Sequence, residues 1–185
     1  MTRIPFAPLV AFGPALFLAC GAPNSFEGTV DRHTLSVSDA IFVEQKTPDG
    51  VTWEADLWLS DRPKICDLVT GGSSVSNATL LLIRLTPGDG GALTAPERRE
   101  YGVRSGTPVA QADFAVTDAN CMNRLIPALA SAESGRVTVA GYKAESGGAL
   151  TGKFDLTFGP QHDKVRGVFN APYCGVAPLM LRKCE

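Results

Sequence analysis

The sequence predicts an all-β fold, an antiparallel β-sandwich or flattened barrel of about eight or nine strands with one short helix. Residues 150–158 and 164–171 alternate apolar and polar side chains, and successive side chains on a strand point to opposite faces. Strand-like runs recur at a spacing of roughly ten residues, and 19 Gly and 13 Pro supply turns between them. A chain of 185 residues, 44% hydrophobic and 19% charged, suits one globular domain with a core of its own.

The fold is expected to centre on three antiparallel strands within residues 135–174, joined by turns at 146–148 and 159–163. A sheet with one apolar face must bury that face against another layer. The pattern Gly-x-Phe occurs twice here, ending at Phe154 and at Phe169. Glycine in a strand lets an aromatic ring lie close to the backbone, so both rings are expected in the core.

The preceding chain supplies further strands, expected at residues 27–30, 34–43, 53–60, 78–85, 101–103 and 109–116. The run 78–85 is apolar on both faces, which is typical of a central strand. Trp58 falls on the polar face of its strand, so it either lies under a loop or is partly exposed. Residues 120–134 are the candidate helix, with its start limited by Pro127, and residues 63–68 are expected to form a helical turn.

The first twenty residues predict export. Arg3 supplies a positive charge, and residues 4–18 form an apolar run of 15 residues. A transmembrane helix needs roughly 20 apolar residues, so this run is a signal peptide rather than a membrane span. It ends in Leu18-Ala19-Cys20.

This ending resembles the lipobox of bacterial lipoprotein signals, in which a small residue precedes the cysteine that is acylated and becomes the first mature residue. Phe17 stands where that family usually has Leu. The resemblance implies a signal peptide at 1–19, diacylation of Cys20 and a lipidated tether at 20–25. The strand patterns then assign residues 26–185 to a single β-rich domain. Gly21 takes the place of the Asp that retains lipoproteins at the inner membrane, which favours the outer membrane. The alternative is an ordinary secretory signal with Cys20 as a chance thiol.

Four cysteines follow Cys20, and an even number in an exported chain indicates disulfides. We expect Cys66 to pair with Cys121 and Cys174 with Cys184. The competing pairing joins Cys174 to Cys66 or Cys121 and leaves Cys184 to the other. Sequence alone cannot fix the connectivity.

No pattern in the sequence indicates an enzyme, a metal site or a cofactor. His33 and His162 lie in turn-like polar contexts, and the sequence has no nucleophile elbow, phosphate-binding loop or Cys-x-x-Cys. Glu54 and Asp56 share the polar face of one strand, where charged residues are expected in any case. The net charge of −2 and the lack of a basic block argue against nucleic acid as a partner.

The sequence is compatible with three functions. The first is a non-catalytic envelope protein, anchored to the membrane by acyl chains on Cys20, that binds another envelope protein or stabilises an assembly. The second is a lipocalin-like barrel that holds a small apolar ligand. The third is an unrecognised hydrolase. Small inward residues such as Gly152, Gly167 and Ala171 leave space for a ligand, but the inward phenylalanines would fill it, so the first is preferred.

Overall fold

A computed structural model of the chain describes residues 24–46, 50–87, 99–104, 109–177 and 183–184. The strands are β1 (Glu27–Gly28), β2 (Asp39–Lys46), β3 (Thr52–Ser60), β4 (Ser73–Ser74), β5 (Thr79–Thr86), β6 (Arg99–Val103), β7 (Val109–Val116), β8 (Ala132–Tyr142), β9 (Ala149–Phe158), β10 (Asp163–Val176) and β11 (Lys183–Cys184). Two short helices, α1 (Ile65–Thr70) and α2 (Pro127–Ala130), complete the described elements.

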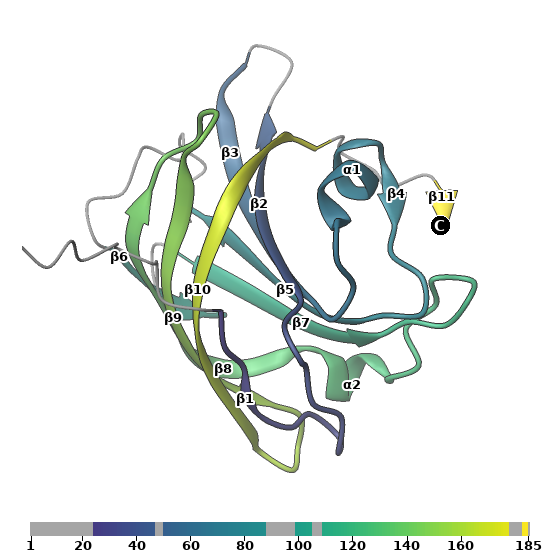
Figure 1. The fold of residues 1–185 in the computed structure, drawn as a ribbon. Helices are drawn as coiled ribbons and strands as arrows, with labels where there is room; N and C mark the ends of the chain where they lie inside the picture. The colour runs from purple at the N-terminus through teal and green to yellow at the C-terminus, as the bar shows by residue number, and fades with distance from the viewer. Residues whose placement is uncertain (1–23, 47–49, 88–98, 105–108, 178–182, 185) are drawn as a thin grey trace, which may run out of the picture.

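Eight of the strands close into a β-barrel (Figure 1). Their order is β10-β2-β3-β5-β7-β6-β8-β9, and β9 pairs with β10 to complete the ring. The pairs β10–β2 and β6–β7 are parallel, and the other six pairs are antiparallel. The predicted all-β barrel is confirmed, with mixed rather than wholly antiparallel pairing.

The three central strands of the sequence prediction are β8, β9 and β10. In β9 the inward side chains Leu150, Phe154, Leu156 and Phe158 are all buried, and the outward Lys153 and Asp155 are exposed. Strand β10 buries Val165, Phe169 and Ala171 in the same way. The predicted alternation therefore assigns these side chains to the correct faces.

Aromatic rings occupy the interior of the barrel. Phe114 packs against Phe158 and Phe26, with ring centroids 6.3 Å and 5.7 Å apart, and Phe26 also lies 6.2 Å from Phe154. The chain between β1 and β2 adds the buried Val30 to this core. Residues 34–37, expected as part of a strand, are not a strand, and β2 begins at Asp39.

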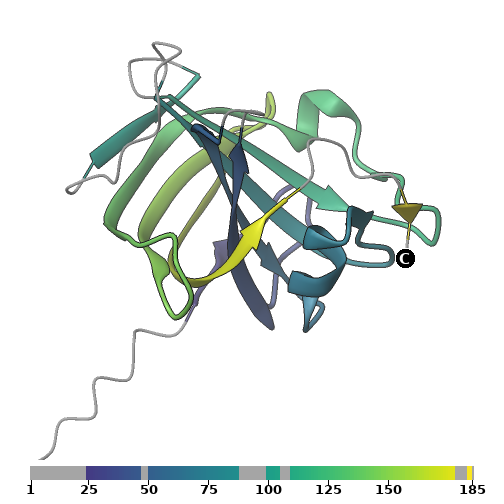
Figure 2. The ribbon, with the colours of Figure 1, turned by 90° about the horizontal axis from the view of Figure 1, so that it is seen from above.

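A second apolar cluster covers the outer face of β2, β3 and β5. Ile65 and Val69 of α1 pack with Val75 against outward residues of the three strands, among them Ile41, Val43, Trp58 and Leu80. Trp58 is 8% exposed, so it lies under this covering layer. Figures 1 and 2 both place α1, β4 and β11 on the side of the barrel opposite β8 and β9.

The predicted helix at 120–134 is wrong. Only Pro127–Ala130 is helical, and β8 already begins at Ala132. Side chains hold the preceding turn, because Asp118 Oδ1 accepts hydrogen bonds from the backbone N–H groups of Asn120 and Met122, at 2.8 Å and 3.0 Å. Asp and Asn side chains that bond nearby backbone favour turns over helix.

The predicted disulfide pairing is also wrong. Cys66 bonds to Cys174, and Cys121 bonds to Cys184, with Cα atoms 5.7 Å and 5.6 Å apart. The first bond ties α1 to the end of β10. The second joins the turn after β7 to β11, which itself pairs with β4. The expectation that Cys174 and Cys184 close a short terminal loop fails because the parallel pairing with β2 carries the end of β10 past α1.

Candidate functional site

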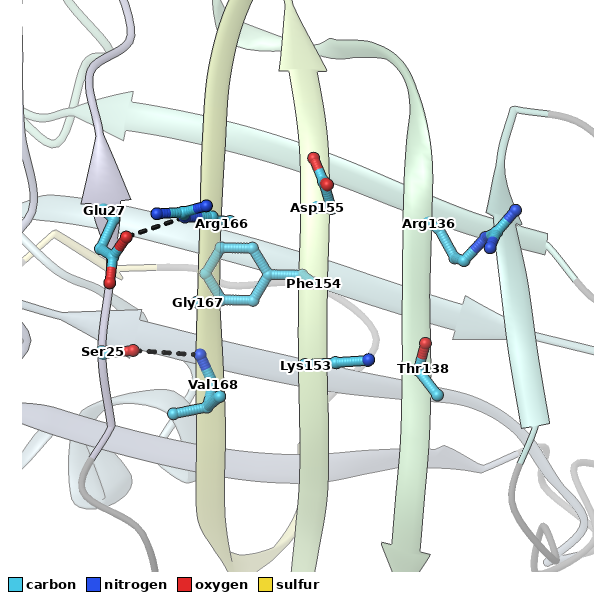
Figure 3. A pocket seen from close by; sticks show the side chains of 10 residues that line it. All are labelled: Ser25, Glu27, Arg136, Thr138, Lys153, Phe154, Asp155, Arg166, Gly167 and Val168. Atoms are coloured by element: carbon cyan, nitrogen blue, oxygen red, sulfur yellow. Dashed lines mark hydrogen bonds and ion pairs between the residues drawn. The ribbon is translucent and has the colours of Figure 1, made fainter.

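A hollow of about 390 Å³ lies on the outer surface of the barrel, over β8, β9 and β10 (Figure 3). Ser25 and Glu27, at the start of the folded chain, form one side of it, and Arg136 and Thr138 of β8 form the other. A second hollow of about 360 Å³ shares Glu27, Asp155 and Arg166 with the first and extends to Lys164. Together these two hollows, called the β8–β10 surface below, form a broad depression lined by both charged and apolar groups.

The N-terminal segment builds one wall of this surface by adding to the edge of β10. The backbone N–H of Ser25 donates to the carbonyl of Val168 at 3.0 Å, and the N–H of Val168 donates to Ser25 Oγ at 3.2 Å. The N–H of Asn170 donates to Asn24 Oδ1 at 2.7 Å. The last two residues of the expected tether therefore belong to the folded body.

Charges of alternating sign form a row across this surface. Register pairs Glu27 with Arg166, Arg166 with Asp155, and Asp155 with Arg136. Arg166 Nε lies 2.8 Å from a carboxylate oxygen of Glu27, and Arg136 Nε lies 2.9 Å from one of Glu100 on β6. Opposite charges facing each other on neighbouring strands stabilise a sheet modestly. The sequence could have predicted this row, because its residues on β8–β10 fall on outward positions.

A buried carboxylate, that of Glu44 on β2, lies in the barrel interior. Glu44 is 5% exposed, and its Oε1 accepts hydrogen bonds from Tyr142 Oη at 2.6 Å and Thr52 Oγ1 at 3.1 Å. Its Oε2 lies 3.1 Å from Lys46 Nζ and 3.3 Å from Tyr173 Oη. Burial alone raises the pKa of Glu44, but the hydrogen bonds from Tyr142, Lys46 and Thr52 outweigh it and hold the pKa below its ordinary value.

The pKa values of the two tyrosines around Glu44 shift in the opposite direction, upwards. Burial, together with the hydrogen bond to the Glu44 carboxylate, raises the pKa of Tyr142 well above its ordinary value. The pKa of Tyr173 is raised by burial and by the charge of Glu44. Both tyrosines also pack on Phe42, with ring centroids 5.5 Å and 5.1 Å away. The group is therefore a closed network, with the carboxylate charged and the phenols neutral.

A second carboxylate group lies on the outer face of β3 and is less exposed than the sequence suggested. Asp56 is 5% exposed and accepts a hydrogen bond from Gln45 Nε2 at 3.3 Å. Burial raises the pKa of Glu54 to about 7, with further contributions from the Asp56 charge and a hydrogen bond between the two carboxyl groups. Burial also raises the pKa of Asp56, although Gln45 and Arg84 oppose the shift. The sequence signal was Trp58, an apolar side chain on the same face, which indicates that this face is covered.

Beside this pair lies a smaller hollow of about 200 Å³ on the outer face of β3, β5 and β7. Its lining includes Trp58, Leu80 and Leu82, with Arg84 among the polar members. The Nε1 atom of Trp58 is buried without a hydrogen-bond partner, as are one oxygen of Gln45 and one of Asp56. The hollow therefore combines apolar walls with a buried donor.

The structure separates most of the residues singled out from the sequence. Cys20 lies outside the described residues. His33 and His162 are both exposed and lie in turns, and the backbone N–H of Asp31 in the first turn donates to Asp163 Oδ2 beside the second at 2.8 Å. Within the described ranges, no group of three or more His, Cys, Asp or Glu side chains is arranged to hold a metal ion. No helix in these ranges is both long and apolar enough to cross a membrane.

Comparisons with protein-family models, with curated proteins and with solved structures give no match to this chain.

Proposed function

We propose that this chain is a non-catalytic bacterial envelope protein, anchored by acyl chains on Cys20, that binds another envelope protein through its outer surface. The short apolar leader ending in Ala19-Cys20 supports the anchor. Two disulfide bonds support export, because such bonds persist in oxidising compartments. Two or more acyl chains bind a membrane stably, since each buried CH₂ group contributes about 0.8 kcal/mol.

The filled interior of the barrel is the reason for proposing a function on the outer surface. Phe114 and Phe158 are completely buried, and Phe154 and Phe169 are each 2% exposed. Phe114 contacts Phe158, and Phe26 contacts both Phe114 and Phe154, so rings fill the space where a lipocalin-like barrel would hold its ligand. A ligand inside would have to displace them, so the barrel is better suited to act as a rigid body with binding surfaces outside. The lipocalin-like carrier is the weaker alternative for this reason.

The partner surface is proposed on the side that carries β11 and the turn after β7. Met122 and Ile126 are 66% and 61% exposed, which is unusual for large apolar side chains close together in sequence. Cys121, next to Met122, lines the hollow beside Trp58 and is bonded to β11. Exposed apolar residues beside an apolar hollow are typical of a surface that binds another protein.

Two measurements test the proposal. Mass spectrometry of the purified chain should find acyl groups on Cys20, and Cys20→Ser should move the protein from the membrane fraction to the soluble fraction. A photo-crosslinking amino acid at Met122 or Ile126 should then yield a discrete crosslinked protein in intact cells. The matched control is Val176, an apolar residue 46% exposed on β10. Equal crosslinking from Val176, or an unmodified Cys20 in a membrane-bound chain, would contradict the proposal.

A further inference from the structure

The folded body begins very close to the proposed anchor. Only residues 21–23 separate Cys20 from Asn24, which is hydrogen-bonded to β10. An extended chain advances at most about 3.6 Å per residue, so Asn24 can lie no more than about 14 Å from Cys20. The headgroup layer of one leaflet is itself about 5–7 Å thick. An acylated chain therefore has almost no slack with which to stand away from the bilayer.

The point of attachment also decides which face turns to the membrane. Asn24 and Ser25 run beside the middle of β10, not at an end of the barrel, because their partners are Asn170 and Val168. Ser25 in turn forms part of the wall of the β8–β10 surface. The anchor thus leaves the body through the side of the barrel that carries this surface.

The charge of the β8–β10 surface suits lipid headgroups. Its basic side chains outnumber its acidic ones, although the whole chain carries a net charge of −2. The basic members are Arg136, Lys153, Lys164 and Arg166, and the acidic ones are Glu27 and Asp155, with Glu100 of β6 beside Arg136. The two arginines are each paired with a glutamate. Among the described residues, Lys153 and Lys164 have no carboxylate within 4.0 Å, so their ammonium groups can face headgroup phosphates.

From these relationships we infer that the barrel lies on its side against the bilayer, with the β8–β10 surface on the headgroups of the leaflet that holds the Cys20 acyl chains. This inference rests on the proposed lipid anchor. Lys153 and Lys164 contact lipid phosphates, while the exposed Val168, the register partner of Lys153 in the first hollow, reaches the interface. The opposite side, with α1, β4 and β11, then faces away from the membrane and is free for a protein partner (Figure 2).

The test uses the purified, full-length, acylated protein in vesicles of phosphatidylethanolamine and phosphatidylglycerol that contain a headgroup spin-labelled lipid. A fluorescent amino acid replaces Val168 in one variant and Met122 in another, which avoids the disulfide cysteines. Quenching at 168 should be severalfold greater than at 122. Equal quenching at the two sites, or stronger quenching at 122, would overturn the inference.

Charge reversal separates headgroup contact from mere proximity. Lys153→Glu combined with Lys164→Glu should reduce quenching at 168, whereas Lys143→Glu, at an exposed lysine on the β8–β9 turn that is paired with Glu145, should leave it unchanged. A loss of quenching from Lys143→Glu equal to that from the double variant would overturn the proposed headgroup contact. Mass spectrometry of the same sample separates the two proposals. An unacylated Cys20 overturns both, and an acylated chain without preferential quenching at 168 overturns only this inference.

Discussion

The ring of Phe169 lies directly over the backbone of Gly152 on the neighbouring strand. A Cβ atom added to Gly152 would be 2.6 Å from Cζ of Phe169, and the two residues are register partners. The reciprocal pair has the same geometry, because a Cβ atom on Gly167 would be 2.5 Å from Cζ of Phe154. Each strand thus provides a glycine for the other strand's ring, as the repeated Gly-x-Phe pattern predicts.

Gly152→Ala should therefore destabilise the barrel. The added methyl group meets the Phe169 ring and also the carbonyl oxygen of Thr138, which belongs to the backbone of β8 and cannot simply rotate away. Overpacking of this kind costs about 1–3 kcal/mol. The free energy of unfolding in denaturant measures it. Gly141→Ala is the control, because its Cβ meets only the side-chain hydroxyl of Thr151, and an equal loss in both variants would argue against the ring contact.

Phe169→Ala should cost about 3–5 kcal/mol in the free energy of unfolding, since it removes a ring that is 2% exposed. The matched substitution is Val168→Ala on the outer face of the same strand, where 36% of the residue is exposed. That change should cost far less. Similar losses in the two variants would mean that the ring contributes little to the core.

Tyr142→Phe should destabilise the protein more than Tyr173→Phe. Both changes remove a phenol that donates to the buried Glu44 carboxylate, but the Tyr142 bond is 2.6 Å long and the Tyr173 bond is 3.3 Å. A hydrogen bond to a charged group contributes about 1.5–3 kcal/mol, so the Tyr142 loss should fall in that range. Chemical unfolding of the two variants in parallel decides the order, and a larger loss from Tyr173→Phe would contradict it.

The Glu54 carboxyl should make stability fall as pH rises. Its pKa is about 7 in the folded protein against an ordinary value of 4.5, so the folded state binds more protons than the unfolded state between these values. The associated stability is fully present below about pH 4.5 and is lost as pH rises through about 7. In Glu54→Gln this loss should disappear, and the variant should gain on the wild type from pH 5 to pH 8. A constant difference between the two proteins across that range would contradict the shifted pKa.

Peptide mapping without reduction should recover two linked pairs, Cys66 with Cys174 and Cys121 with Cys184. The first bond closes a loop with a sequence separation of 108, for which chain entropy predicts about 4–5 kcal/mol of stabilisation. The double variant Cys66→Ser/Cys174→Ser should lose stability of that order. A peptide that links Cys174 to Cys184 would contradict the pairing.

Local patterns in the sequence predicted much of the barrel because they depend on neighbouring residues alone. Alternation placed Phe154 and Phe169 inside, and the doubly apolar run at 78–85 became β5, which has β3 and β7 as neighbours. Trp58 was expected under a loop or partly exposed, and it is buried in a cluster with Ile65 and Val69 of the helix α1 and with Val75. In each case the polarity of the side chain predicts whether it is buried.

Features that depend on distant pairing could not be predicted in the same way. The disulfide partners follow from the parallel pairing of β10 with β2, which no local pattern encodes. The burial of Asp56 depends on the layer over its strand, which comes from elsewhere in the chain. The helix predicted at 120–134 failed for a more local reason, because the side chain of Asp118 holds a turn there.

Strand β10 closes the barrel by pairing with strands from both ends of the described chain, and this sets the order in which the protein can fold. Its partners are β9, just before it, and β1 and β2, at the other end of the described chain. Contacts between residues far apart in sequence form slowly, because a long loop must close before they are made. A chain delivered N-terminus first, by a ribosome or through an export channel, therefore keeps β1 and β2 without their last partner until residues 163–176 emerge. Barrel closure is a late event that follows release of nearly the whole chain, and until then the first strands are open edges that a chaperone could hold.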